Sequence, residues 1–457
     1  MKKTYLLLAA LLLTVSLAAQ NPTSYFMEGS TFRSQLNPAF APLRGYINLP
    51  AIGGVSVGTN GNIALNNILY PRNGKLVTLL DSSVSADEAL RNLQADNLLG
   101  GDTRVNLFGI GKFTRNHKNF WSVDLDVRTS AETHLPKSLF EFLKLGRQGN
   151  ISGIGASAES YLEAGFNYSL PLLNDRLYVG VRGKFLVGLA RAQVDYQRFD
   201  VSLEQDRWAV DTRGTVTVTA DGTTVSPNPE TGTFEMNDLR FRPRKPAGYG
   251  FAVDLGATYD ILPELQVSLA VNDLGFISWS KRATISGVST QQSEFTGVTV
   301  PDNGSDPTPD FDLEMLKFNQ TESRSLSKML RASLNAGIEY EVWEHRIGVG
   351  LLYTARFWSY RTAHNITASV NIHPLRWFTL TSSYSVLDNR AGAVGLGLNL
   401  CPGWINFFVA TDLLLTRHTP QWVPVKQSTA NATIGIGIPL GRRSHRIAAY
   451  IRENDRK

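Results

Sequence analysis

The chain has 457 residues and a formal net charge of +5 at pH 7. This near balance of charge gives no case for a nucleic-acid partner, and the length suits one large barrel or about two to three ordinary domains. The lone cysteine, Cys401, excludes an intrachain disulfide framework and a metal site made of cysteines alone.

Residues 1–19 have the pattern of a secretory signal peptide. Lys2 and Lys3 form a positive region, residues 5–13 form an apolar core, and the expected cleavage follows Ala18 or lies one residue later. The apolar core is short for the alternative, an N-terminal membrane anchor. Beyond residue 20, no apolar run approaches the roughly 18 residues of a spanning helix. The mature chain is therefore expected to be periplasmic, secreted or an outer-membrane barrel.

Two polar connections, residues 62–101 and 129–158, each hold one expected helix. The first helix covers residues 85–93 with Ser85 as its N-cap, and the second is an amphipathic run at 137–145. Most of the remaining chain alternates apolar and polar side chains, which predicts β-strands. The expected strands are 44–58, 103–113, 121–128, 162–170, 177–189, 249–260, 265–279, 330–342, 347–358, 365–372, 377–387, 393–400, 404–414 and 429–439.

The stretch 249–260, YGFAVDLGATYD, shows the alternation most clearly. Its odd positions are all apolar, whereas its even positions are small or polar. Successive side chains of a strand point to opposite faces, so one face is apolar and has a tyrosine near each end. This length and decoration are typical of a strand that crosses a bilayer, which takes about 9–11 residues with aromatic residues at both interfaces.

Every second connection between the expected strands is short. The other connections include all the long ones, above all 191–248, with an expected hairpin turn at Asp221-Gly222, and 281–328. Short turns on one side and long loops on the other are typical of outer-membrane barrels, where the short turns are periplasmic. The short turns are 114–119, 173–176, 261–264, 343–346, 373–376 and 401–403.

The pattern predicts an all-β fold, a transmembrane antiparallel barrel of about fourteen strands over residues 44–440, in the cell outer membrane. Residues 441–457 would form a periplasmic tail, although an additional strand at 447–451 would break the parity. A bulge is expected at residues 272–275, where the alternation slips. The competing architecture is a secreted protein of several β-sandwich domains, which gives no reason for the aromatic residues that flank the apolar faces.

The chain resembles an uncharacterised outer-membrane barrel family of gut-type Gram-negative bacteria. That family is similar to the long-chain fatty-acid transporter superfamily and to the shuttle barrel of type IX secretion. The resemblance rests on the signal peptide, on Asn37-Pro38-Ala39 and on residues 271–275 followed by Trp279. It implies that the irregular segment 20–43 forms an N-terminal plug. Two departures are Phe40, where the transporters have a small residue, and the lack of a terminal aromatic residue.

The alternation places a set of charged side chains on the inner face of the barrel. These side chains form either a polar path that contacts a ligand or a salt-bridged filling, and the filling is the favoured interpretation. The candidate lumen-facing residues are Asp124, Asp126, Arg128, Arg182, Lys184, Asp254, Arg331, Glu339 and Glu341, and the plug motif is Asn37, Pro38 and Ala39.

No enzyme motif is present in the sequence. The seven histidines lack metal-ligand spacing, and there is no GxSxG nucleophile motif and no phosphate loop at residues 392–397. No catalytic residue, metal or cofactor is therefore expected. Trp343, Trp377 and Trp404 are expected to begin strands beside short turns, which indicates a periplasmic aromatic girdle, and packing in a core is the alternative.

Two functions remain open. The first is passive transport of a hydrophobic or amphipathic small molecule across the outer membrane, and the second is a non-transporting scaffold or secretion-system accessory. The scaffold would bind a protein partner, such as a surface protein, through its long loops. An apolar groove in the lumen would favour transport, whereas a sealed and charge-paired lumen would favour the scaffold.

Overall fold

The computed structural model describes most of the chain between residues 22 and 441. The expected signal peptide, the tail beyond residue 441 and the possible strand at 447–451 lie outside the described residues. The described ranges are 22–63, 67–72, 75–116, 118–146, 149–203, 208–295, 317–343, 346–360, 362–375, 377–387, 390–412 and 430–441.

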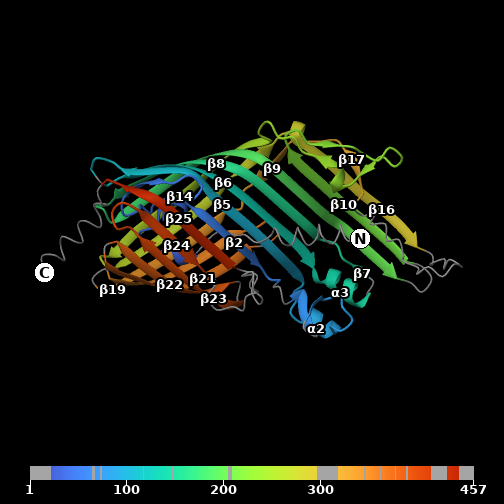
Figure 1. Cartoon of the computed structure of the whole chain (residues 1–457), viewed down its shortest axis with the longest axis horizontal. Helices are drawn as coiled ribbons and strands as arrows, with labels where there is room; N and C mark the ends of the chain where they lie inside the picture. Colours follow the sequence, from blue (N-terminus) through green and yellow to red (C-terminus); the bar gives the residue numbers. More distant parts are fainter. Residues whose placement is uncertain are drawn as a thin grey trace.

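The described residues form one closed antiparallel barrel (Figure 1). Fourteen strand positions make up its circumference, and we call each of them a stave. The first stave is made of two short strands, β1 and β2, which both pair with β5 on one side and with β25 on the other, and this pairing closes the barrel. The staves are β1 (Gly45–Asn48) with β2 (Val55–Gly61), β5 (Asp96–Phe113), β6 (Phe120–Pro136), β8 (Ile154–Leu172), β9 (Leu177–Leu203), β14 (Gly248–Leu262), β15 (Leu265–Trp279), β19 (Ser333–Trp343), β20 (Ile347–Phe357), β21 (Thr362–Leu375), β22 (Phe378–Leu387), β23 (Arg390–Leu400), β24 (Asn406–Thr411) and β25 (Ala430–Leu440).

The barrel is apolar outside and polar inside, which is the arrangement of a barrel built for lipid. On β14, Phe251 is 61% exposed and Leu255 is 46% exposed, whereas Asp254 between them is 1% exposed. A water-soluble barrel would bury the apolar face instead. The predicted all-β barrel of about fourteen strands is confirmed, and the sandwich alternative is wrong.

Short turns gather at one end of the barrel, as predicted. Each expected short turn joins two consecutive staves, for example residues 114–119 between β5 and β6 and residues 173–176 between β8 and β9. The predicted bulge is also present. Val253 pairs with Leu274 but Leu255 pairs with Val271, and Asp273 adopts a left-handed backbone with φ of 62°.

The two long connections contain more strand than expected. The region 191–248 begins with the second half of β9, which pairs with β10, and β10 pairs with β16 of the region 281–328. The hairpin turn lies between β9 and β10, not at Asp221-Gly222. The strand after Gly222 is β11, which pairs with β13. These strands pair with one another, so their backbone N–H and C=O groups have partners that a loop would leave to water.

The strands β5, β6, β8 and β9 are longer than the others, so the barrel is taller on their side, and β10 and β16 extend this side (Figure 1). We call these six strands the tall side. The connection 62–101 also holds the β3–β4 hairpin, and β5 and β6 run further into their connections than expected. The remaining short elements are η1 (Pro22–Ser24), η2 (Thr31–Gln35), β3 (Leu69–Arg72), β4 (Lys75–Thr78), β7 (Gly149–Asn150), β10 (Trp208–Ala220), β11 (Thr224–Val225), β12 (Thr233–Phe234), η4 (Met236–Asp238), β13 (Leu239–Arg240), η5 (Lys281–Ala283), β16 (Thr284–Phe295), β17 (Phe318–Thr321) and β18 (Leu326–Met329).

Both expected helices form. In α2 (Ala86–Leu90), the Ser85 hydroxyl accepts a hydrogen bond from the Glu88 backbone N–H at 3.2 Å, which is the predicted N-cap. The second, α3, spans Lys137–Leu145 and ends at Gly146 in a left-handed conformation. Within the described residues, neither helix nor any other is long and apolar enough to cross a membrane.

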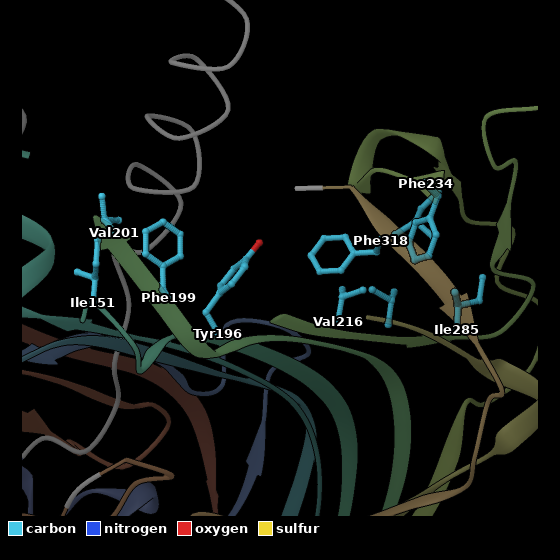
Figure 2. Close-up of a cluster of buried hydrophobic side chains, with 10 residues drawn as sticks. Ile151, Tyr196, Phe199, Val201, Val216, Phe234, Ile285 and Phe318 are labelled. Atoms are coloured by element: carbon cyan, nitrogen blue, oxygen red, sulfur yellow. The ribbon is translucent and has the colours of Figure 1, made fainter. Parts of the chain in front are cut away.

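The tall side carries its own apolar core on one face. Figure 2 shows Tyr196 and Phe199 of β9 and Val216 of β10 projecting from one face of these strands. The alternating residues Gln193 and Asp195 do not belong to this core; the carboxylate of Asp195 accepts a hydrogen bond from Tyr360. The sheet thus has an apolar face and a polar face above the barrel.

We predict that Leu255→Arg strongly weakens folding into a bilayer. An arginine on the lipid face near the bilayer midplane costs about 2–4 kcal/mol. The matched control is Phe241→Arg, because Phe241 is 53% exposed but follows β13 outside the barrel. Urea-dependent folding into vesicles measures both variants, and an equal loss in both would contradict a lipid-facing β14.

Candidate functional site

Residues 22–40 lie inside the barrel and are held by side chains of the wall. Carbonyl groups of this N-terminal segment accept hydrogen bonds from asparagine and serine side chains on four staves, β8, β15, β19 and β24, so its irregular backbone has partners away from water. These bonds are Asn272 Nδ2 to Leu36 O at 2.9 Å, Asn335 Nδ2 to Leu36 O at 3.1 Å, Asn406 Nδ2 to Gly29 O at 2.9 Å, Asn167 Nδ2 to Pro38 O at 3.3 Å and Ser169 Oγ to Ala39 O at 3.3 Å.

The triplet Asn37-Pro38-Ala39 forms a tight turn against the wall. The Asn37 side-chain oxygen accepts a hydrogen bond from the Ala39 N–H at 3.0 Å. Two wall glycines make room for the turn. A Cβ on Gly180 would lie 2.2 Å from the Pro38 carbonyl, and one on Gly256 would lie 2.1 Å from the Asn37 side-chain oxygen. Positions 180 and 256 therefore require glycine, because any Cβ there would overlap this turn.

The same segment brings apolar side chains into a lumen that is otherwise polar. The Arg33 guanidinium lies 3.9 Å from the centroid of the Phe40 ring, and the Tyr25 hydroxyl is 3.0 Å from Ser268 Oγ. We name this group the lumen apolar cluster. It consists of Tyr25, Phe26, Met27, Phe32, Leu36, Phe40, Leu352, Phe408 and Ala410.

A dense network of ion pairs fills the lumen beside β5, β6, β8, β9, β14 and β15. Six of the nine candidate lumen-facing residues belong to it: Asp124, Asp126, Arg128, Arg182, Lys184 and Asp254. We name it the central charge network, and Arg104, Glu163 and Asp273 complete it. Its main contacts are Arg104–Asp126 at 2.6 Å, Arg128–Asp273 at 2.7 Å, Arg182–Asp124 at 3.1 Å, Lys184–Asp254 at 2.7 Å and Lys184–Asp273 at 2.6 Å.

Glu163 is the hub of this network. It is fully buried and lies 3.0 Å from Arg104, 3.0 Å from Arg128, 3.5 Å from Arg182 and 3.7 Å from Lys184. The candidate list omitted Glu163 and Arg104, although both alternate onto predicted inner faces, so the same periodicity identifies them. Asp273 had no such signal, because the bulge at residues 272–275 removes the parity on which its direction depends.

A second group of ion pairs crosses the lumen at the end with the long connections. Arg356 meets Asp102 at 2.6 Å, and six staves separate β20 from β5 whichever way one counts around the barrel. Arg331 meets Glu132 at 3.2 Å. The Trp358 ring lies between the two arginines, 5.3 Å from Arg331 and 4.9 Å from Arg356. Side chains from opposite walls thus close this mouth of the barrel.

Tyr360 adds to the closure of the mouth. Its hydroxyl donates to Asp195 at 2.6 Å, and its ring stacks on His134 at 5.3 Å between centroids. Burial raises the pKa of Tyr360, and the hydrogen bond to Asp195 raises it further, so the hydroxyl keeps its proton at neutral pH.

The remaining candidates lie apart from the central charge network. Arg331 belongs to the mouth, as described. Glu339 lies beside the N-terminal segment, 4.0 Å from Arg33, and its carboxylate accepts a hydrogen bond from Asn371 at 2.7 Å. Glu341 lies two residues further along β19, where its backbone N–H donates to the Glu264 carbonyl at 2.8 Å.

A kink in the first stave opens a small cavity behind the wall. Residues 49–54 leave the strand between β1 and β2, and Ala51 has φ of 62°. The cavity behind them measures about 10 Å³ and has Phe32 and Phe408 on one side. Three buried polar atoms of its lining residues, Gln35 Oε1, Asn48 Oδ1 and Arg104 Nε, have no hydrogen-bond partner among the described residues. The size of the cavity, with two hydrogen-bond acceptors and one donor, suits about one water or one polar group of a ligand.

The described residues hold no group of three or more His, Cys, Asp or Glu side chains arranged to bind a metal ion. Cys401 is a buried free thiol beside the short turn after β23.

The chain belongs to the family of unknown function DUF5723, whose model matches residues 38–412. No curated protein matches the chain. The resemblance to type IX secretion and to gut-type bacteria stays a prediction.

Several solved structures are similar over nearly the whole chain. A Pseudomonas aeruginosa FadL homologue is 9% identical, with 92% of this chain and 98% of that chain covered and a TM-score of 0.46. The Pseudomonas putida toluene transporter TodX is 10% identical, with 92% and 94% covered and a TM-score of 0.42. The translocator domain of the autotransporter NalP from Neisseria meningitidis is 8% identical, with 92% and 96% covered and a TM-score of 0.33.

We predict that Arg182→Met destabilises the barrel by about 3–5 kcal/mol, the usual effect of leaving a buried charge without its partner. Asp124 then loses Arg182, the cation that lies 3.1 Å from it. Arg72→Met, which removes an exposed pair with Glu88, is the control and changes stability by about 1 kcal/mol or less. Urea unfolding followed by tryptophan fluorescence measures both.

The double variant Arg182→Met with Asp124→Asn tests the cause of that loss. Because it removes the stranded carboxylate together with its cation, it should regain part of the lost stability. A double variant no more stable than Arg182→Met would show that packing, and not charge, explains the loss.

Proposed function

We propose that this member of the DUF5723 family is an outer-membrane barrel that passively transports a hydrophobic or amphipathic small molecule. Residues 1–19 direct its export and are removed. Residues 20–43 act as a plug, residues 44–440 form the barrel, and residues 441–457 form a periplasmic tail. The function requires no catalytic residue, metal or cofactor, and its partners are outer-membrane lipid and the transported molecule.

The observation that carries the proposal is the lumen apolar cluster beside the kink. Six of its nine side chains belong to the N-terminal segment, and the wall supplies Leu352, Phe408 and Ala410. If the segment shifts, these wall residues become an apolar surface in a polar lumen, and burying a hydrocarbon chain there would replace the lost contacts. Phe32 and Phe408 also line the cavity behind residues 49–54, so the apolar surface continues to the interrupted stave.

The way in which the segment is held also supports a movable plug. Its contacts to the wall are mainly neutral hydrogen bonds, each worth about 0.5–1.5 kcal/mol, and its ion pair between Arg33 and Glu339 is long at 4.0 Å. The central charge network lies on the opposite half of the wall. In this proposal, the network keeps that half rigid, and the nine predicted residues serve as filling more than as ligand contacts.

A second function is favoured by one specific observation, the closure of the lumen. The plug, the central charge network and the mouth ion pairs leave little space, and a sealed lumen suits a scaffold. The tall side, built from β9, β10 and β16, would then present a surface to a secretion-system or surface protein.

Native mass spectrometry of protein purified from outer membranes in mild detergent separates the two functions. A fatty acid or another lipid bound at fixed stoichiometry would support transport and contradict a pure scaffold. A stoichiometric protein partner without a small ligand would favour the scaffold. Recovery of the protein in the soluble fraction would contradict both, because the barrel would then lie outside the membrane.

We predict that Gly180→Val opens the lumen without touching the plug sequence. The new side chain would overlap the Pro38 carbonyl and displace the Asn37-Pro38 turn, whereas Gly183→Val on the same strand meets no atom within 4 Å and is the matched control. Liposome swelling in arabinose measures the effect. Gly180→Val should swell several-fold faster than wild type, and Gly183→Val should not.

Equal swelling of wild type and Gly180→Val would contradict a plug at this position, provided that the variant migrates as a folded barrel on unboiled gels. If Gly180→Val does not fold, Asn37→Ala is the second variant, because it removes the bonds that fix the same turn while adding no volume.

A further inference from the structure

The end of the barrel with the short turns carries an excess of positive charge on one side. This basic sector comprises residues 112–119 and 172–176, which are the turns after β5 and β8 with their flanking residues. The two turns contact each other, because Lys118 Nζ lies 2.6 Å from Asp175 Oδ2. The sector holds four cations and one acid, namely Lys112, Arg115, Lys118, Arg176 and Asp175. After that pair has formed, three positive charges are left.

The next short turns along the chain carry the opposite charge. Residues 260–264 hold two acids and no lysine or arginine, and residues 341–346 hold two acids and one arginine. The Asp260 backbone N–H donates to the Arg176 carbonyl at 2.9 Å, so the acidic turns begin directly beside the basic sector. Among these four turns, positive charge is therefore concentrated on the side of β5, β6, β8 and β9.

The outer face of the wall beside the basic sector has the composition of a membrane interface. Lys112, Trp121 and Tyr168 are register partners on β5, β6 and β8. Two residues from Tyr168 on the same face, Phe166 is 52% exposed on the lipid side. The Tyr168 hydroxyl accepts a hydrogen bond from Asn119 Nδ2 of the turn at 2.8 Å, so the polar end of the ring is directed toward the turn. Amphipathic aromatic rings of this kind mark the level of the lipid head groups.

The three remaining cations lie at or just beyond that level. Lys112 is exposed on the lipid-facing side of β5, so its aliphatic stem covers apolar surface while its ammonium group reaches the head groups. Arg115 and Arg176 are exposed on the two turns beyond this row. A guanidinium group binds a phosphate through two parallel hydrogen bonds, so the arrangement suits a phosphate at the membrane surface.

We propose that the basic sector binds an anionic phospholipid of the periplasmic leaflet, with the lipid phosphate between Lys112, Arg115 and Arg176. The acyl chains lie along the apolar outer faces of β5, β6 and β8. A zwitterionic phospholipid with the same chains carries its own ammonium group, so it gains less from the three cations. This inference rests on the proposed place of the barrel in the outer membrane with its short turns in the periplasm, and not on transport.

A lipid titration followed by native mass spectrometry tests the proposal. The folded protein is stripped of lipid in mild detergent and titrated with phosphatidylglycerol or, separately, with phosphatidylethanolamine of the same acyl chains. A lysine or arginine beside an anionic head group strengthens binding about fivefold, so wild type should prefer phosphatidylglycerol by about tenfold or more. The triple variant Lys112→Gln with Arg115→Gln and Arg176→Gln should lose most of this preference.

Arg176→Gln and Arg346→Gln form a matched pair of single variants. Both arginines are exposed at short turns of the same end of the barrel, but Arg346 belongs to an acidic turn and lies 5.7 Å from the centroid of the Trp343 ring. Arg176→Gln should weaken the binding of phosphatidylglycerol about fivefold, whereas Arg346→Gln should change it less than about twofold.

Three results would overturn the proposal. These are equal affinity of wild type for the two lipids, an equal loss in Arg176→Gln and Arg346→Gln, and displacement of phosphatidylglycerol by inorganic phosphate, which would indicate a site for free phosphate. If the triple variant does not migrate as a folded barrel on unboiled gels, the two single variants decide. The site lies outside the barrel, so these variants should leave a molecule bound in the lumen in place. Failure of this proposal therefore leaves the transport proposal intact, and the reverse also holds.

Discussion

Glu163 satisfies the constraint on which the inside of this barrel depends, namely that a charge removed from water needs opposite charges around it. It is fully buried on β8 and lies within 4 Å of four cations that come from β5, β6 and β9. Those cations in turn hold Asp126, Asp124, Asp254 and Asp273. One carboxylate thereby connects the side chains of six neighbouring staves into a single unit.

The two halves of the wall solve the problem of a polar interior in different ways. The half from β5 to β15 pairs charges with charges, which gives strong and directional contacts. The half from β19 to β25 carries mainly Ser, Thr and Asn side chains, such as Asn335 and Asn406, and these bond to the backbone of the N-terminal segment. A half held by ion pairs and a half held by neutral hydrogen bonds are the physical basis of the proposal that the N-terminal segment can move while the barrel does not.

The kink between β1 and β2 lies at the boundary between these halves. Its cavity has Arg104 of the central charge network on one side and Phe32 and Phe408 of the lumen apolar cluster on the other. The cavity therefore combines polar and apolar groups at the place where the first stave is interrupted, between β1 and β2.

By itself, the sequence determined the class of fold, because alternation with a period of two depends only on which residues face lipid and which face the lumen. It predicted the strand 249–260, the short turns, both helices and the bulge, and it placed Asp124, Asp126, Arg182 and Asp254 on inner faces. Only the tertiary structure decided which of these charges meet. Arg356 and Asp102 lie on opposite walls, and Asp273 turns inward through a bulge, so neither contact follows from local periodicity. The location of residues 22–40 and the pairing of β10 with β16 were likewise decided by contacts between segments far apart in the chain, for which local sequence carries no signal.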